Sequence, residues 1–282
     1  MPRKRRETRR ERKPTDRKTG VSGKRFRTDP AFKNSRRAMG EFGLGSGSAF
    51  LLRRAFLPML GTLPQKKLQA NLTGLITTLV REKKKAGAKR IRLNQLQWER
   101  LRNFDFNEEA TLSSLLIADF TINRQKKPPA INITLPGAGV TQMVKAMPEI
   151  THIRVTAGLA AIDFEKEKIS KDLVTSGYIT AEENSTEPIS LDLRLPQTLS
   201  HPLFLMLGFT IFKKDGPQLY ELHNTRYRAF RIIHVWPAPP PAYKQKTPAP
   251  PKAAAKPVKK KPAPAKKKAA PKTARPKNKP RR

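Results

Sequence analysis

Apolar residues recur at helical spacing in the first part of the chain. The clearest stripe lies between residues 64 and 85, where apolar side chains fall three or four positions apart. Its members are Leu68, Leu72, Leu75, Ile76, Leu79 and Val80. The segment ends on Arg81-Glu82-Lys83-Lys84-Lys85, and the helix dipole favours cations at that end. The pattern predicts a helix over residues 64–85.

A helix start precedes this stripe. Asp29 is a good capping residue, and Pro30 suits the first helical position, where a missing N–H costs nothing. A mainly apolar face then follows at Phe32, Ser35, Met39 and Phe42. A second helical segment is predicted over residues 49–57, with Pro58 and Gly61 at its end. Both helices are basic on their polar side, which suits packing against the body, a partner helix or a second copy.

Small residues separate these two segments. The run Gly43-Leu44-Gly45-Ser46-Gly47-Ser48 resembles a phosphate-binding loop at first sight. Such a loop requires Lys and Ser or Thr directly after its last glycine, and a dinucleotide-binding loop requires a preceding strand. The sequence meets neither requirement. We therefore expect either a flexible joint or a face of small side chains that allows close helix packing.

From Leu112 onward, apolar and polar residues alternate, which indicates short strands with one buried face. Residues 203–212 are apolar on both sides and predict a central strand. Residues 213–217 predict a turn that returns the chain as a hairpin. The predicted strands cover residues 112–123, 130–135, 151–157, 159–164, 174–180, 189–195, 203–212, 218–222 and 229–236. Many short strands at regular spacing are typical of an antiparallel β-sandwich of immunoglobulin-like or Greek-key kind.

These patterns predict an α+β protein with four parts. We expect a disordered basic arm over residues 1–28, a helical region over 29–110, a β-sandwich domain over 111–236 and a disordered tail over 237–282. In this arrangement the N-terminal helices pack on the antiparallel β-sandwich, and the basic tails flank the folded part.

Charge is distributed very unevenly over these parts. The chain carries a formal net charge of +37. Residues 1–28 hold 13 basic and 3 acidic side chains, and residues 237–282 hold 16 basic and none that are acidic. Residues 111–236 hold 14 basic and 12 acidic side chains. A nearly neutral body is thus expected to carry two strongly basic arms.

The composition of the arms predicts disorder and a polyanionic partner. Both lack the apolar residues needed to offset the entropy cost of ordering a chain, and the tail consists almost entirely of Pro, Ala and Lys. Each phosphate that such lysines neutralise releases a condensed cation. Solubility alone, or an anionic membrane surface, would also fit, but apart from Tyr243 the arms offer no apolar anchor. The expected phosphate-binding residues are Arg3, Lys4, Arg5, Arg6, Arg9, Arg10, Arg12, Lys13, Lys259, Lys260, Lys261, Lys266, Lys267 and Lys268.

Several short motifs resemble a known family. Residues 27–32 read R-T-D-P-A-F, Arg36-Arg37 and Glu41-Phe42-Gly43 follow, and residues 103–107 read N-F-D-F-N. This order resembles a group of uncharacterised bacterial proteins with a "TDPAF…R…EFG" helical opening and a β-rich C-terminal half. The resemblance covers about residues 20–236 and implies bacterial origin and architecture, but no activity. Members of that group are less basic at the start and lack the Pro/Ala/Lys tail.

The sequence offers little for catalysis or metal binding. It has no cysteine, and none of its four histidines, His152, His201, His223 and His234, is spaced as a helical metal pair. Nucleophile-elbow, zinc-protease and calcium-loop motifs are absent from the sequence. We therefore expect no enzyme activity, catalytic residue, cofactor or metal. The sequence also predicts no signal peptide and no membrane span, which favours a cytoplasmic location.

Aromatic residues beside arginines leave two interpretations open. Trp98, Phe104 and Phe106 interleave with arginines at positions 92, 100 and 102. Such rings can stack on the bases of a nucleic-acid single strand. Alternatively, together with Leu101 they form the junction that docks the helices on the sandwich, which is the interpretation we favour.

Two functions follow from these patterns. The first is a non-enzymatic nucleic-acid-binding protein, in which the folded centre holds the arms and DNA and RNA are equal candidates. The second is a structural or scaffold subunit that assembles through the β-sandwich and the amphipathic helices, with the helical region as a candidate surface for a homo-oligomer. A recessed, charged cavity in the β-rich half would contradict the idea that the centre only holds the arms.

Overall fold

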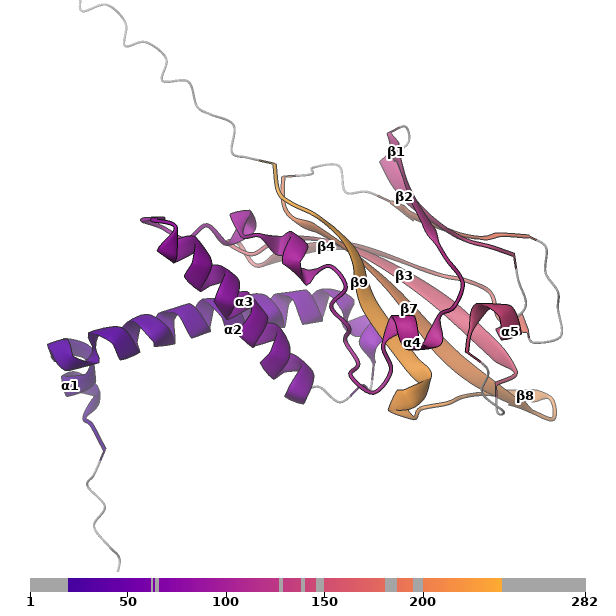
Figure 1. Cartoon of the computed structure of the whole chain (residues 1–282), viewed down its shortest axis with the longest axis horizontal. Coiled ribbons are helices and arrows are strands. Elements are labelled where there is room, and N and C mark those ends of the chain that lie inside the picture. The colour runs from indigo at the N-terminus through magenta and orange to yellow at the C-terminus, as the bar shows by residue number, and fades with distance from the viewer. Residues whose placement is uncertain are drawn as a thin grey trace, which may run out of the picture. The chain divides into compact units, whose positions relative to one another are not determined.

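The protein is an α+β fold in which N-terminal helices precede two antiparallel sheets that pack together (Figure 1). The computed structural model describes residues 20–61, 63, 66–126, 129–137, 140–145, 150–180, 187–194 and 200–239. All of these residues belong to one compact unit of the chain. Of the arms expected to be disordered, 1–28 and 237–282, residues 1–19 and 240–282 lie outside the described residues. Residues 23–28 form helix α1, so the expected disorder is wrong for that part.

The helical region is dominated by two helices, α2 and α3. The helices are α1 (Gly23–Thr28), α2 (Lys33–Leu60), α3 (Lys66–Lys85), α4 (Leu112–Leu115) and α5 (Val140–Met143). Helix α1 lies inside the segment assigned to the first basic arm, and the hydroxyl of Ser22 accepts from the N–H of Arg25 at its start. Asp29 caps the next turn as predicted, since its carboxylate accepts from the N–H of Ala31 (2.9 Å). None of the described helices is long and apolar enough to cross a membrane.

Helix α2 runs without a break through the small-residue segment, so the expected flexible joint is wrong. The other expectation for this segment, close helix packing, is confirmed at Gly45, which is buried against α3. A Cβ atom at Gly45 would lie 2.2 Å from the hydroxyl oxygen of Thr77 and 3.0 Å from its backbone nitrogen. Only glycine therefore permits this crossing. Pro58 does not end the helix but lies inside its last turn.

The strands form a six-stranded and a three-stranded antiparallel sheet. In chain order they are β1 (Thr121–Lys126), β2 (Pro129–Leu135), β3 (His152–Asp163), β4 (Lys168–Thr175), β5 (Ile179–Thr180), β6 (Ile189–Arg194), β7 (Leu203–Asp215), β8 (Gln218–Glu221) and β9 (Arg228–Trp236). The small sheet has the order β1-β2-β6. In the large sheet, β4, β3, β7 and β8 follow one another, while β5 pairs with β3 and β9 with β7.

The predicted strands are mostly correct in position but not in extent. The hairpin after β7 is confirmed, because Asp215 pairs with Gln218 across Gly216, whose φ of 58° suits a tight turn. The segments 151–157 and 159–164 are one strand, β3, rather than two. Residues 112–115 form α4 and not the start of a strand, because Thr111 caps them: its hydroxyl accepts from the N–H of Ser114 (3.2 Å).

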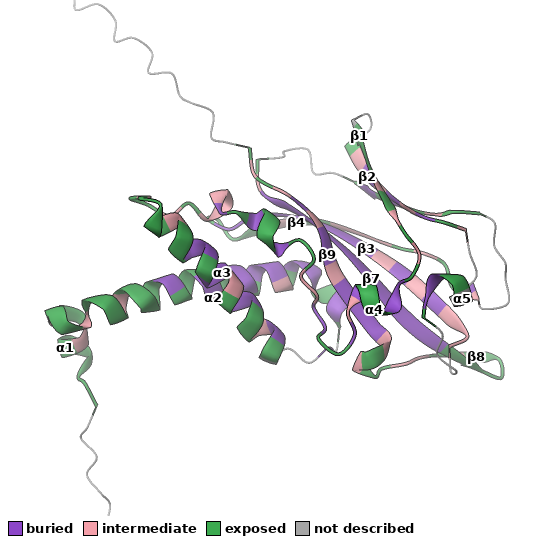
Figure 2. Ribbon diagram, viewed as in Figure 1, coloured by how far each residue is buried: buried purple, intermediate pink, exposed green. Residues whose placement is uncertain are grey.

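The large sheet is buried on both faces, which explains why the first ten residues of β7 are all buried (Figure 2). One face packs on the small sheet, with Val155, Leu205 and Leu207 meeting Ile131 and Leu193 in one apolar cluster. The opposite face belongs to a second cluster, which also contains the buried side chains of α2 and α3. The protein therefore has three layers, in the order helices, large sheet and small sheet.

An aromatic junction joins the helices to the large sheet. Trp98 is fully buried, its ring stacks on Phe164 at 4.2 Å, and its Nε1 donates to the carbonyl of Leu93 (2.9 Å). Phe106 is buried in the same cluster, and Phe104 packs against it. The docking interpretation of these rings is thus confirmed, since rings buried in this way cannot stack on nucleic-acid bases.

Candidate functional site

The fourteen residues expected to bind phosphate lie outside the described residues. Within the described part, the densest group of cations follows the end of α3, where residues 81–92 hold seven Lys or Arg and one acidic residue. Six of these seven cations are exposed, and Lys83 is half-buried. Glu82, the acidic residue, is paired with Arg100. The folded part therefore presents a basic patch of its own, which we call the α3-end patch (residues 81–92).

Glu41 of α2 links that patch to the neighbouring helix. Its carboxylate is buried and accepts from Nε of Arg37 (2.8 Å) and Nε of Arg81 (3.2 Å), with Nζ of Lys84 at 3.5 Å. The hydrogen bond from Arg37 is the main cause that lowers the pKa of Glu41 below 4.5; burial opposes it, and Arg81 and Lys84 add to the lowering. The ionised carboxylate thus holds α2 and α3 together.

Replacing this carboxylate should weaken the fold in a pH-dependent way. We expect Glu41→Gln to lower the free energy of unfolding by about 1 kcal/mol at pH 7, because the three cations are about half exposed and solvent screens part of the interaction. The folded pKa is the lowered one, so this stability is present above pH 4.5 and is lost as the pH falls through the folded value. Urea denaturation of both proteins between pH 3 and 7 measures the difference.

Glu99→Gln is the matched control, because Glu99 is exposed and no ion pair involves it in the described structure. A destabilisation by Glu41→Gln that is the same at pH 3 and pH 7 would show that the charge of Glu41 is not the cause.

The motif residues of the helical opening have structural roles. Arg36 donates from Nη1 to the carbonyls of Phe26 (2.6 Å) and Asp29 (2.8 Å), which ties α1 to the start of α2. Arg37 and Glu41 form the ion pair described above. These residues of the T-D-P-A-F and E-F-G segments therefore stabilise local structure and bring no reactive group together.

The N-F-D-F-N segment adds a short extended stretch to the edge of β9. The N–H of Asn103 donates to the carbonyl of Ile232 (2.7 Å), and the N–H of Phe106 donates to that of Phe230 (2.7 Å). Asn103 has a φ of 67°, a conformation that asparagine tolerates better than most residues. Asn107 donates to the carbonyl of Arg228 (2.6 Å) and closes the segment.

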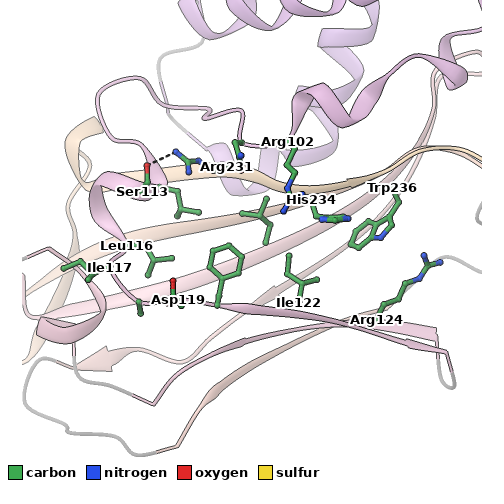
Figure 3. Close-up of a pocket in the computed structure, with 15 residues that line it drawn as sticks. Arg102, Ser113, Leu116, Ile117, Asp119, Ile122, Arg124, Arg231, His234 and Trp236 are labelled. Atoms are coloured by element: carbon green, nitrogen blue, oxygen red, sulfur yellow. Dashed lines mark hydrogen bonds between the residues drawn. The ribbon is translucent and has the colours of Figure 1, made fainter.

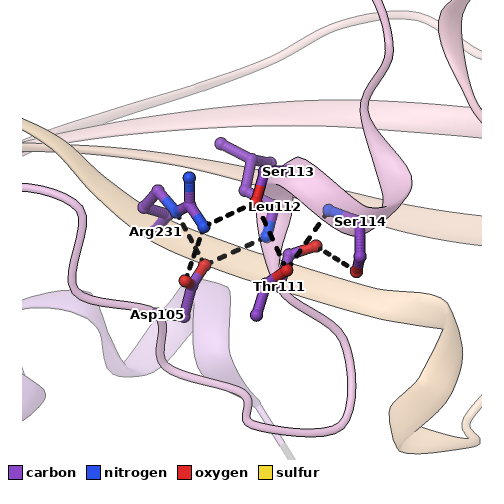
Figure 4. Close-up of polar contacts among 6 residues, drawn as sticks. All are labelled: Asp105, Thr111, Leu112, Ser113, Ser114 and Arg231. Carbon is purple, nitrogen blue, oxygen red and sulfur yellow. Dashed lines mark hydrogen bonds and ion pairs between the residues drawn. The ribbon is translucent and has the colours of Figure 1, made fainter.

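This pairing places Asp105 opposite Arg231 of β9 (Figure 4). Arg231 donates from Nε and Nη2 to the two carboxylate oxygens of Asp105, at 2.8 and 2.6 Å. Nη2 also donates to the hydroxyl of Ser113 (3.0 Å), and Asp105 accepts from the N–H of Leu112 (3.0 Å). Arg231 is thus neutralised and fixes the start of α4, so it offers no free charge to a ligand.

A bulge in β9 changes which side chains face the small sheet. His234 pairs with Leu205 of β7, but Ile232 pairs with Met206, so Ile233 is an extra residue. Ile233 packs in the cluster between the sheets, as regular alternation requires, and Trp236 packs against the same cluster after the bulge. Ile232 and Val235 belong to the helix-side cluster. The bulge therefore puts Ile233 and His234 in succession on the side of the small sheet.

A cavity of about 650 Å³ lies at this place, between β9, β1 and α4 (Figure 3). Apolar side chains line much of it, namely Leu112, Leu116, Ile117, Ala118, Phe120, Ile122, Ile233 and Trp236. Polar and charged side chains complete the lining, namely Arg102, Asn103, Ser113, Asp119, Arg124, Arg231 and His234. A cavity with charged groups in its lining is the feature that would argue against a folded centre that only holds the arms.

The pKa of His234, whose ring lines the cavity, is lowered. Burial is the main cause that lowers the pKa of His234 below 6.5, and the positive charge of Arg102 adds to it. Its ring lies 4.3 Å from that of Trp236, centroid to centroid. His234 is therefore neutral at pH 7 and sits in an excess of positive charge.

The other histidines are scattered. The sequence left open that His152 and His234 meet across strands, but they pair with Phe212 and Leu205 of β7 and so lie at opposite ends of the sheet. His201 lies 3.7 Å from Asp163. Among the described residues, no three His, Cys, Asp or Glu side chains come together in a way that could hold a metal ion.

Sequence reasoning missed the cavity for a physical reason. Strict alternation along β9 places His234 on the helix side, and only the bulge reverses it. The lining also combines Arg124 of the small sheet with Arg102, which precedes α4, and with residues of β9 in the large sheet. Comparison with known proteins gives no further guide, because no family model matches this chain and no curated protein matches it either.

Proposed function

We propose that this protein is a non-enzymatic nucleic-acid-binding protein that makes largely sequence-independent phosphate contacts through its Lys- and Arg-rich ends. The observation that carries the proposal is the charge distribution: residues 1–28 and 237–282 together hold 29 basic and 3 acidic side chains. Counterion release favours the binding of such segments to phosphates at many points, without one fixed geometry. DNA and RNA are equal candidates for the polyanion.

The α3-end patch supports the same proposal from the folded part. Its exposed cations give a polyanion a fixed point of contact on the folded part, and phosphate contacts of this kind orient a protein without reading bases. No catalytic role is needed. We also propose that the two sheets form an immunoglobulin-like or Greek-key sandwich, because the chain passes from the small to the large sheet between β2 and β3 and again between β6 and β7.

The salt dependence of binding tests the proposed function. If ten cations engage duplex phosphates, the logarithm of the association constant should fall against the logarithm of salt concentration with a slope near −9, from about −0.9 per phosphate. Fluorescence anisotropy with labelled duplexes of unrelated sequence, between about 0.05 and 0.3 M salt, measures it. Duplexes of different sequence should bind alike. A slope shallower than about −3, or a strong sequence preference, would exclude the proposed mode of binding.

A second candidate is a structural or scaffold subunit, and one feature of α2 favours it. Met39, Phe42, Phe50 and Leu57 are 45–61% exposed. Their spacing puts them on one side of α2, away from Gly45 and Phe56, which are buried against α3 and the sheet. Such an exposed apolar stripe suits a partner helix or a second copy. A monomer in sedimentation of the full chain across a wide concentration range would count against assembly with a second copy.

A further inference from the structure

The cavity beside β9 has the features of a ligand site. Its volume of about 650 Å³ falls within the range of about 300–1,000 Å³ that is typical of small-molecule sites. Eight of its fifteen lining residues are apolar and the other seven are polar or charged, so a ligand there meets both an apolar wall and several polar groups. Its lining comes from β1, β9, α4, the segment 116–120 between α4 and β1, and residues 102–103. Strand pairing fixes β1 and β9, and the Asp105–Arg231 ion pair fixes the start of α4.

Positive charge without a counterion is concentrated at one end of the cavity. Within the described residues, neither Arg102 nor Arg124 has an anionic partner. Arg124, on β1, lies over the ring of Trp236 at 6.0 Å. Arg102 lies close enough to His234 for its charge to disfavour the protonated imidazole. Both arginine side chains are exposed: Arg102 lies beside His234, and Arg124 lies beyond Trp236 at the rim of the cavity (Figure 3).

The remaining charged groups do not balance these two arginines. Arg231 is neutralised by Asp105. Asp119 lies near Ile117, well separated from Arg102, Arg124 and Trp236 (Figure 3). The cavity is therefore polarised, with a carboxylate towards one end and two guanidinium groups beside aromatic rings at the other.

We propose that this cavity binds a small organic anion, with a flat apolar body held in the cavity and its charged group attracted to the end that carries Arg102 and Arg124. The rings of Phe120, His234 and Trp236 offer faces and edges to a flat ligand, and the aliphatic side chains exclude water from its apolar body. A guanidinium group recognises carboxylate, sulfonate and phosphate groups through paired N–H donors. The proposal is independent of nucleic-acid binding by the arms.

Two probes of the same shape and different charge test the proposal. We expect 1-naphthoate to bind the full-length protein saturably and to displace the fluorescent sulfonate 1-anilinonaphthalene-8-sulfonate, and we expect the neutral 1-naphthamide to bind at least about tenfold more weakly. Titrations in about 0.3 M salt screen non-specific attraction of the anionic probes to the Lys- and Arg-rich ends of the chain. Equal affinity for the two probes, or no saturable binding of either, would overturn the proposal.

Substitutions locate the site. The double variant Arg102→Gln, Arg124→Gln should weaken naphthoate binding at least about tenfold and leave naphthamide binding nearly unchanged. Arg54→Gln is the matched control, because Arg54 is an exposed arginine of α2 outside the cavity lining. Ala118→Phe places a ring in the cavity and should remove binding of both probes while the circular dichroism spectrum stays the same. Unchanged naphthoate binding in the double variant would overturn the proposal.

The same variants separate this site from the proposed function. In the double variant, the slope of the logarithm of the nucleic-acid association constant against the logarithm of salt concentration should differ from that of the unmodified protein by about 2 at most. The reason is that only two cations are removed, at about 0.9 per phosphate. Loss of naphthoate binding with an unchanged nucleic-acid affinity would support an independent ligand site. Loss of nucleic-acid binding together with naphthoate binding would overturn the independence of the two.

Discussion

Removing residues 1–27 and 237–282 should reduce the affinity of this protein for nucleic acid about a thousandfold or more in 0.1 M salt. The deleted segments carry most of the excess positive charge, and each phosphate that is no longer neutralised makes the salt slope shallower by about 0.9. The slope should therefore fall from near −9 to −3 or shallower. Anisotropy titrations of the two proteins with the same duplex, over the same range of salt, measure both quantities.

Substitutions in the full-length chain provide the control for this deletion. Replacing six lysines of the tail by glutamine should make the slope shallower by about five, at six times about 0.9, without altering the folded part. These lysines are Lys259, Lys260, Lys261, Lys266, Lys267 and Lys268. A tail with the same composition in shuffled order should bind as the natural one does. Unchanged affinity after both the deletion and the lysine replacements would rule out the arms as the binding segments.

Trp98→Ala should lower the free energy of unfolding by about 3–5 kcal/mol, the usual cost of removing a large, fully buried aromatic side chain. Trp98 stacks on Phe164, meets Phe204 edge-on at 5.6 Å and donates a hydrogen bond to the carbonyl of Leu93. Its loss opens a void where the helical region meets the large sheet. Urea denaturation followed by circular dichroism measures the effect.

Trp236→Ala is the control for this substitution. Trp236 is only partly buried and lines the cavity on the opposite face of the large sheet, so its loss should cost markedly less stability. A Trp98→Ala variant as stable as the wild type would show that this junction does not hold the helices on the sheet. The two tryptophans also allow the two faces to be followed separately by fluorescence.

Local sequence rules predicted most of the elements because local physics determines them. The Asp29 cap and the turn at Gly216 depend on a few adjacent residues, and both appear where expected. The stripe of α3 is equally local, since its apolar side chains face one way at helical spacing. The Trp98 junction could be inferred as well, because aromatic rings at the boundary between helical and β-rich segments are usually buried there.

Tertiary contacts decided the elements that sequence rules missed. Glycine disfavours helix by about 1 kcal/mol relative to alanine, so the run after Phe42 indicated a joint; the packing of Gly45 against Thr77 outweighs that cost. Likewise, β3 continues through Gly158, because this residue pairs with Leu173 of β4 and Met206 of β7. Glycine is needed there to make room for α2, since a Cβ atom would collide with the sulfur of Met59. Each case depends on a residue far away in the chain.

The two candidate sites, the arms and the cavity, also differ in whether local sequence or tertiary contacts determine them. The arms stay a prediction from composition, because disorder and counterion release are argued from charge and apolar content and not from geometry. The cavity could not be predicted in this way, because it depends on one extra residue in β9 and on the pairing of Asp105 with Arg231, which is 126 positions away. No periodicity in the sequence records either feature.

The two halves of α2 are held in place by different interactions, so they should unwind at different rates. Up to Gly40, only Arg36 is even partly buried, and its bonds to the α1 turn and the Glu41 network hold this half in place. Beyond Gly45, buried side chains such as Leu52 and Phe56 secure the helix to the sheet. Amide hydrogens of the first half should therefore exchange with solvent by local fraying, long before those of the second half do. Met39 lies on this first half, and the exposed Phe42 lies between the two halves beside the Glu41 ion pairs, so a partner that contacts both would bind at the boundary between the fraying and the secured parts of α2.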